Sequence, residues 1–127
     1  MKIYLAGASK ELDTCKHYIE RLKVLGHTIT HDWTKEVEAN TDANPREAPI
    51  ETMRIWSNAD FNGVYKANII WLLIPNNNSA GCWIEYGYAL GVGRNVIVSG
   101  DWRKSIFSSL AFERYANHEL ALDFFKS

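Results

Sequence analysis

Short apolar runs alternate with amphipathic stretches along the chain, and each change of period predicts a change of secondary structure. Residues 2–6 (KIYLA) form an apolar run that ends at a glycine, which is typical of a buried strand followed by a turn. Apolar side chains then recur at helical spacing through residues 10–25, with Ser9 as the expected N-cap. The alternating, β-branched residues 27–31 (HTITH) predict a second strand. This order predicts a strand-helix-strand unit with parallel strands.

The polar residues 34–48 show no period and predict one long loop, a class of segment that often forms lids or binding elements. Pro49 suits the first turn of a helix that continues toward residue 67. Residues 69–74 (IIWLLI) are continuously apolar, as a central parallel strand covered on both faces should be. The remaining pattern predicts a helix over 81–93, strands over 95–99 and within 110–115, and a last helix capped by Asn117.

Strands and helices alternate throughout, which predicts the α/β class. We expect one domain over residues 1–127, with an open, mostly parallel sheet flanked by helices in a Rossmann- or flavodoxin-like three-layer sandwich. Ligands of such sheets bind beyond the carboxyl ends of the strands. Residues 7–10, 75–85 and 99–103 are therefore the expected site segments.

Composition narrows the choice of partners. The chain has 14 basic and 15 acidic residues, and this balance argues against a nucleic acid polymer as partner. Its longest apolar run, residues 67–75, is far shorter than the roughly 20 residues that span a membrane. Two cysteines, Cys15 and Cys82, are too few for a disulfide framework and predict reduced thiols in the cytoplasm. The histidines lack metal-ligand spacing, so we expect neither a metal nor a cofactor.

Glu85 is the sharpest candidate for chemistry. It follows a turn-rich loop at the expected ligand edge, among small and apolar neighbours (GCWIEYGYALG). We expect the nearby helix N-terminus to stabilise its anion, and an ionised carboxylate is a usable nucleophile at carbon. A first-turn glutamate on a solvated surface explains the local sequence equally well.

Asp60 and Tyr4 are the next candidates. Asp60 lies in an otherwise apolar stretch (ADFNGV), and two carboxylates in one pocket could divide nucleophilic attack from proton transfer. Tyr4 could orient a carboxylate through its phenol. Taken alone, each has a simpler explanation, because helix acids are mostly solvated and a strand tyrosine is commonly part of the core.

The loop after the first strand has the chemistry of an anion site. Gly7, Ser9 and Lys10 offer backbone N–H groups, a hydroxyl and a cation where a helix begins. Their spacing is that of neither a GxGxxG fingerprint nor a P-loop. Cys82 also lies near a helix start, where a thiol can be activated. No histidine lies near it in sequence, and close packing is the better explanation of the Gly-Cys pair.

Four segments, KIYLAG, ADFNG, GCWIEYGYALG and GRNVIV, resemble the nucleoside 2-deoxyribosyltransferases and the related 2'-deoxynucleoside 5'-monophosphate N-glycosidases, over roughly residues 2–99. The resemblance implies that a carboxylate breaks an N-glycosidic bond. Glu85 matches the nucleophile that forms a glycosyl-enzyme intermediate. Asp60 matches the residue that handles protons at the leaving base, and Tyr4 the residue that orients the nucleophile. A second base as acceptor makes a transferase, and water makes a hydrolase.

One position departs from the transferases. Six residues before the nucleophile they carry an aspartate that accepts the sugar 5'-hydroxyl, whereas this chain has Ser79. The monophosphate N-glycosidases carry serine there, which donates to the 5'-phosphate, and Ser9 and Lys10 fall in their phosphate loop. Ala8 replaces a serine of that loop. The expected ligand is a nucleoside or nucleotide, with a phosphorylated one favoured, and Gly81 is a further candidate contact.

The base-binding end is less defined by the sequence. Asp32 and Trp33 follow the second strand, and Trp33 could stack on a base. Trp83 and Trp102 are alternatives, and any of the three could be core. Most members of the family complete the site from a neighbouring subunit, so we expect a homodimer or a larger homo-oligomer. Two alternatives stay open: a hydrolase restricted to nucleoside 5'-monophosphates, and a non-catalytic binder of a nucleotide-derived ligand.

Overall fold

The computed structural model describes residues 1–40 and 47–126. Its strands form one sheet in the order β2-β1-β3-β4-β5, and every neighbouring pair is parallel. The α/β class with an open parallel sheet is therefore confirmed. The strands are β1 (Lys2–Ala6), β2 (Thr28–Ile29), β3 (Ile69–Leu73), β4 (Asn95–Ser99) and β5 (Glu113–Tyr115).

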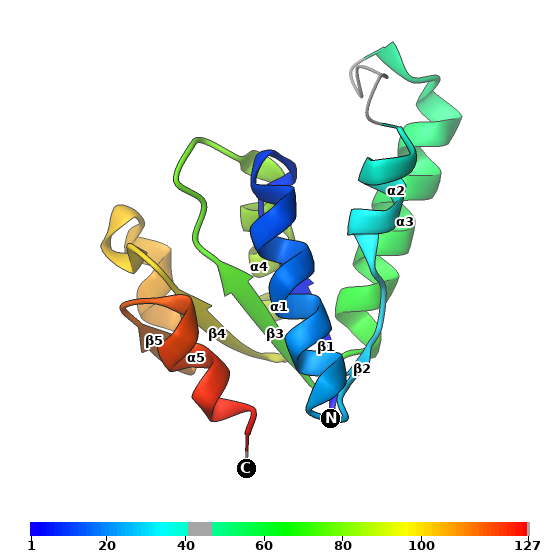
Figure 1. The fold of residues 1–127 in the computed structure, drawn as a ribbon. Helices are drawn as coiled ribbons and strands as arrows, with labels where there is room; N and C mark the ends of the chain where they lie inside the picture. Colours follow the sequence, from blue (N-terminus) through cyan, green and yellow to red (C-terminus); the bar gives the residue numbers. More distant parts are fainter. Residues whose placement is uncertain (41–46, 127) are drawn as a thin grey trace.

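Helices cover both faces of the sheet, as the three-layer prediction requires (Figure 1). One face carries α1 (Leu12–Val24) and α5 (His118–Phe124), joined where the Tyr18 hydroxyl donates to Glu119 at 2.6 Å. The other face carries α3 (Ile50–Lys66) and α4 (Ala80–Gly91), joined by stacking of Phe61 on Tyr88. Short 3-10 turns are η1 (Ser9–Glu11), η3 (Trp102–Lys104) and η4 (Ile106–Leu110).

The order of the strands fixes where a ligand can bind. The chain passes from β1 to β2 on one side and later returns to β3 on the other side of β1, so the topology reverses between β1 and β3. Loops that leave neighbouring strands diverge at such a point and open a crevice at the carboxyl edge of the sheet. Beyond this edge stand α2 (Trp33–Ala39) and the N-terminal half of α3 (Figure 1).

The continuously apolar run of the sequence forms the centre of the core. Every residue of β3 is buried, with Trp71 fully so. Its indole N–H donates to the hydroxyl of Ser99 on β4 at 2.8 Å, which satisfies a polar group that would otherwise be buried without a partner. Burial on both faces therefore explains why residues 69–74 lack alternation.

The prediction of one loop over residues 34–48 is wrong at its start, because α2 forms over Trp33–Ala39. Asp32 caps this helix: its carboxylate accepts from the backbone N–H of Thr34 at 3.1 Å and from the Thr34 hydroxyl. Trp33 is buried and its indole N–H donates to the carbonyl of Leu5 at 2.8 Å. Val37, one turn later, also packs against the core, so the cap and a short apolar contact hold a helix whose other residues are polar. Residues 41–46 lie outside the described residues.

Two smaller differences concern the ends of elements. Ser9 caps no helix with its side chain, because η1 precedes α1. The second strand is only Thr28–Ile29, shorter than the predicted residues 27–31.

Cys15 and Cys82 are both buried and free. In the described parts of the chain, no helix has the length and apolar character needed to cross a membrane.

Candidate active site

A buried tyrosine-glutamate pair forms the centre of the site. Tyr4 lies on β1 and is fully buried, and Glu85 lies on α4 with 9% of its surface exposed. The Tyr4 hydroxyl donates to Oε2 of Glu85 at 2.5 Å across 81 residues of sequence. The fold therefore brings together the two residues that the sequence analysis linked only by hypothesis, and the phenol holds the carboxyl group in one orientation.

Burial, rather than the helix dipole, controls the charge on Glu85. The pKa of Glu85 is raised from its ordinary value of 4.5 to about 8. Desolvation is the largest cause, the negative charge of Asp60 raises the pKa further, and the Tyr4 hydrogen bond opposes them by lowering it. Because α4 begins at Ala80, Glu85 lies in the second turn, beyond the reach of most of the dipole. The expectation that the helix start stabilises the anion is therefore wrong.

Asp60 is half-buried on α3 and faces two titratable neighbours. The Nε2 atom of His31 lies 3.5 Å from Oδ1 of Asp60 and 3.1 Å from Oε1 of Glu36. Burial raises the pKa of Asp60 to about 6, while His31 lowers it and Glu36 raises it. The two carboxylic acids of the site thus ionise over different pH ranges, an arrangement that allows separate roles.

Two glycines allow the elements of the site to approach one another. A Cβ on Gly63 would lie 2.8 Å from Cβ of His31 and 2.9 Å from Cδ2 of Tyr4. A Cβ on Gly7 would lie 2.6 Å from Sγ of Cys15. Only glycine fits at these contacts, which bring α3 onto β1 and the first loop onto α1.

Glu85 and Asp60 line the same cavity, which has a volume of about 710 Å³, within the range of small-molecule sites. Six of the seven predicted binding residues also line it; the seventh, Asp32, is engaged as the cap of α2. Those six are Gly7, Ser9, Lys10, Trp33, Ser79 and Gly81. The cavity therefore joins the segments that follow β1, β2 and β3.

The end of the cavity where the sequence predicts an anion is formed by η1 and the start of α4. Ser79 precedes α4 and makes no side-chain capping bond, so its hydroxyl is not used by the helix. Glu11 accepts from the backbone and side-chain N–H groups of Asn76, at 3.2 and 2.9 Å, and ties the two loops together. No acid lies within ion-pairing distance of Lys10 among residues 1–40 and 47–126.

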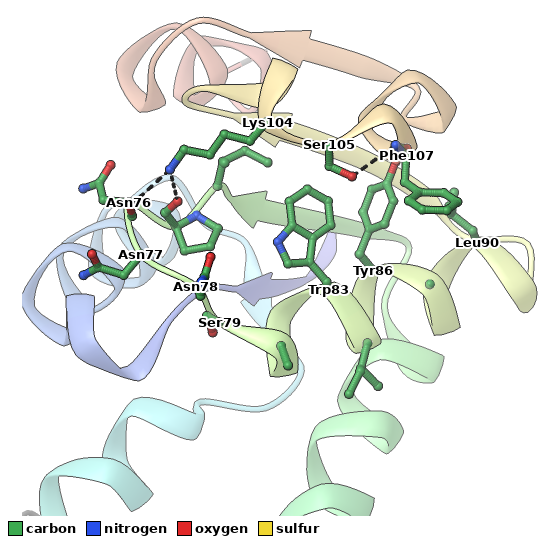
Figure 2. Close-up of a pocket in the computed structure, with 15 residues that line it drawn as sticks. Asn76, Asn77, Asn78, Ser79, Trp83, Tyr86, Leu90, Lys104, Ser105 and Phe107 are labelled. Carbon is green, nitrogen blue, oxygen red and sulfur yellow. Dashed lines mark hydrogen bonds between the residues drawn. The ribbon is translucent and has the colours of Figure 1, made fainter.

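The other candidates have structural surroundings. Cys82 is buried, its thiol contacts the carbonyl of Ser79 at 3.4 Å, and burial raises its pKa, the opposite of an activated thiol. Trp102, in η3, packs under the guanidinium of Arg103 and does not line the cavity that holds Glu85. Trp83 lines a second hollow on the other side of α4 (Figure 2).

That second hollow is larger, about 1000 Å³, but differs in chemistry. It is lined by Trp83, Tyr86 and Phe107, and Lys104 crosses one end to donate to the carbonyls of Pro75 and Asn76 (Figure 2). No carboxylate is among its described lining residues. The candidate active site is therefore the smaller cavity.

Sequence reasoning missed His31 and Glu36, which meet Asp60 with their ligand atoms within 4.8 Å of one another. A histidine and two carboxylates can hold a divalent cation, so these three are the side chains that could do so here. One feature of the sequence could have identified His31: it follows the second strand, at the carboxyl edge of the sheet where a ligand is expected. Spacing could not reveal it, because the three residues come from three separate elements.

Comparisons with known proteins bear on the fold. No family model and no curated protein sequence matches the chain. A solved structure of a 2-deoxyribosyltransferase from Bacillus psychrosaccharolyticus is similar, with a TM-score of 0.73 over all of this chain and 91% of the other, at 18% sequence identity. The chain therefore has the fold of a 2-deoxyribosyltransferase.

Proposed function

We propose that the protein is an enzyme that cleaves or transfers the N-glycosidic bond of a (deoxy)nucleoside or a nucleoside 5'-monophosphate. The observation that carries this proposal is the Tyr4–Glu85 hydrogen bond of 2.5 Å in a cavity that also contains Asp60. A fold shared with a 2-deoxyribosyltransferase supports it. Oriented attack and a separate proton donor are the two requirements for displacing a base from a sugar.

In the proposed reaction, a carboxylate oxygen of Glu85 forms a bond to the anomeric carbon as the bond from that carbon to the base nitrogen breaks. The electron pair of the broken bond stays on the base, and Asp60 supplies the proton that neutralises it. The Tyr4 hydroxyl holds Glu85 in the attacking orientation. Water or a second base then displaces the glycosyl group from Glu85, which decides between hydrolysis and transfer.

Base release from a panel of nucleosides and nucleotides tests this proposal. Glu85→Gln keeps the shape of the side chain but removes the nucleophile, and we expect a loss of about 10³-fold or more in kcat. Glu113→Gln, on the exposed edge strand β5, is the matched control. Retention of activity by Glu85→Gln, with the fold verified by circular dichroism, would contradict the proposed mechanism.

We further propose that the substrate carries a 5'-phosphate. Ser79, with its hydroxyl free of the helix cap, lines the cavity together with Lys10 and with Gly81 of the first turn of α4. A helix N-terminus is a favourable place for an anion. Ser79→Asp places a like charge against a phosphate and should reverse the preference between a monophosphate and its nucleoside. An unchanged preference would argue against a phosphate at this end.

A non-catalytic binder is the alternative function. Mass spectrometry of small molecules released by denaturing the purified protein separates the two. An intact nucleotide, bound equally by the protein and its Glu85→Gln variant, would favour the binder. Release of free base in the wild type alone would favour the enzyme.

The cytoplasmic location and the absence of cofactors also stay predictions.

We also propose that the protein is a homo-oligomer. Ile84 is exposed on α4 and lines both the active-site cavity and the second hollow. Exposed Phe107 of η4 lines the second hollow with Ile84, and Ile106 and Leu110 of the same turn are also exposed. A second copy of the chain on this surface would border the cavity and restrict the access of water.

A further inference from the structure

We propose that Glu11, Asn76 and Lys104 form a clasp that positions the end of the active-site cavity where a 5'-phosphate would bind. The loop of residues 75–79 joins β3 to α4 and carries Ser79, which lines that cavity. The clasp ties this loop to both η1 and η3. None of its three members lines the cavity, so they are positioning residues that act through others. This inference rests on the proposed 5'-phosphate.

Asn76 anchors the loop. The side chains of residues 76–78 are exposed, so no apolar contact fixes the middle of the loop. The backbone and side-chain N–H groups of Asn76 both donate to the carboxylate of Glu11, at 3.2 and 2.9 Å. Lys104 donates to the carbonyls of Pro75 and Asn76, at 2.8 and 3.2 Å (Figure 2). In the described parts of the chain, the two residues after Asn76 make no side-chain hydrogen bond, so the clasp supplies the polar anchors of this stretch.

A single peptide group of the loop lies between an acidic and a basic side chain. The peptide between Pro75 and Asn76 donates its N–H to Glu11 at 3.2 Å and accepts at its carbonyl from Lys104 at 2.8 Å. Among residues 1–40 and 47–126, neither side chain lies within ion-pairing distance of an opposite charge. Because hydrogen bonds that share an amide strengthen one another, loss of either side chain should weaken the contact of the other.

The clasp joins the two segments on which the proposed phosphate would rest. Glu11 is the last residue of η1, and the two residues before it, Ser9 and Lys10, line the cavity. Ser79 comes three residues after Asn76 and lines the same cavity. The bonds between Glu11 and Asn76 therefore hold the donors of one segment in register with those of the other. A phosphate that needs donors from both segments binds well only while this register is kept.

Relaxation of ¹⁵N in the free protein tests the clasp without a ligand. We expect residues 76–79 to have order parameters of about 0.85 in the wild type and below about 0.6 in Lys104→Met. Arg103→Met is the matched control, because it removes the same charge from the same turn while the Arg103 guanidinium packs on Trp102. Lys104→Arg keeps a cationic donor and should restore most of the order. An ordered loop in Lys104→Met would overturn the proposal.

Titration with inorganic phosphate tests the link from the clasp to the site. We expect Lys104→Met and Glu11→Ala each to raise the Kd for phosphate about 10-fold, and Arg103→Met to change it less than about 2-fold. Glu11→Ala is the sharper variant, because removal of an acid from the neighbourhood of an anion would by charge alone tighten binding. Tighter or unchanged binding in Glu11→Ala would overturn the proposal.

Kinetics separate positioning from a general loss of structure. With the nucleoside 5'-monophosphate that the wild type cleaves fastest, both variants should raise KM about 10-fold and keep kcat within about 2-fold. The reason is that Glu85 is held by Tyr4 of β1 rather than by the clasp. With the matching nucleoside, which has no phosphate, KM should stay unchanged. Equal losses on the two substrates would reduce the clasp to a structural element and contradict its role at the phosphate.

The clasp and the proposed function fail in different ways. If the wild type binds inorganic phosphate but cleaves no nucleoside or nucleotide, the proposed function is contradicted, and relaxation and titration still decide whether the clasp positions the site. If the wild type binds no phosphate, the proposed 5'-phosphate is contradicted together with the role of the clasp. If phosphate binds and the loop stays ordered in Lys104→Met, only the clasp is contradicted.

Discussion

The protonation states of Glu85 and Asp60 run against their proposed roles, since burial raises the pKa of the nucleophile to about 8 and that of the proton donor to only about 6. The reactive form needs Glu85 ionised and Asp60 protonated. The two-unit gap, 8 minus 6, leaves about 1% of the free enzyme in that form at neutral pH. A low population of a highly reactive state is compatible with catalysis, because the less stabilised carboxylate is the stronger nucleophile.

The pH dependence of kcat/KM follows from these values. For a nucleoside that does not titrate, we expect a bell-shaped profile with its maximum near pH 7, between limbs at about 6 and 8. Because the reactive form is the minor one, with Glu85 ionised and Asp60 protonated, the alkaline limb lies at the pKa of Glu85 and the acid limb at that of Asp60. Tyr4→Phe removes a hydrogen bond that lowers the Glu85 pKa, so the alkaline limb should move to higher pH and the maximum should fall. A lower maximum with an unmoved limb would argue that Tyr4 acts only by packing.

Stability should depend on Glu85 in a defined direction. Its pKa is about 8 in the folded protein against an ordinary value of 4.5, so the native state holds this proton more tightly than the unfolded chain. The contribution to stability is complete below about pH 4.5 and is lost as the pH rises through 8. Urea unfolding should be measured at pH 5, 7 and 9. The free energy of unfolding of Glu85→Gln, relative to that of the wild type, should rise with pH by at most roughly 5 kcal/mol. A difference that is constant with pH would contradict the buried, protonated Glu85.

Helix α3 carries Asp60, and its N-terminal half extends beyond the sheet (Figure 1). Its close approach to β1 depends on Gly63. The Cβ of His31 and the ring of Tyr4 leave no space there for a methyl group. The position of Asp60, one turn earlier, is therefore tied to the packing of His31 and Tyr4 against the same helix.

Gly63→Ala should lower the free energy of unfolding by about 1–3 kcal/mol and reduce activity, because its Cβ displaces His31 and Tyr4. Gly87→Ala is the matched control within α4, since a Cβ there meets nothing within 4 Å. This control should gain about 0.5–1 kcal/mol from helix propensity alone. Thermal or urea unfolding followed by circular dichroism compares the two. Equal stabilisation of both variants would contradict the close contact at Gly63.

The molecule as a whole presents an apolar surface beside its site, where η4 and α4 leave large side chains exposed. We expect sedimentation of the 14.5 kDa chain to give a mass of at least twice that value. Ile106→Asp, at a residue 83% exposed, should shift the protein toward the monomer. Val24→Asp, at a residue 86% exposed on α1, should leave the mass unchanged. A wild-type monomer, or equal effects of both variants, would refute the proposed interface.

Local pattern was sufficient for much of this architecture. The apolar run of β3, the proline before α3 and the Asn117 cap of α5 each depend on neighbours within a few residues, and each is confirmed. The order of elements then implies a parallel sheet, because strands joined through helices run in one direction. Glu85 and Asp60 were identified as candidates for the same reason: acids stand out in apolar surroundings.

Helix α2 shows where local pattern was insufficient. Only Trp33 and Val37 of its residues pack against the core, and the helix is also held by the Asp32 cap and by the bond from Trp33 to Leu5 of β1, 28 residues away in sequence. The meeting of Glu36 with His31 and Asp60 depends on that anchor. Such contacts join segments that the sequence does not relate, so their chemistry becomes visible only in the folded chain.

The sequence by its own periodicity determined the α/β sheet, the edge at which a ligand is expected and the acids worth testing, because these follow from spacing along the chain. Only the tertiary structure decided how those acids are charged. Glu85 is desolvated by packing between β1 and α4, and Asp60 is placed against His31 by the contact at Gly63. Burial and through-space charge depend on which distant residues meet, and that is decided by the packing of the whole chain.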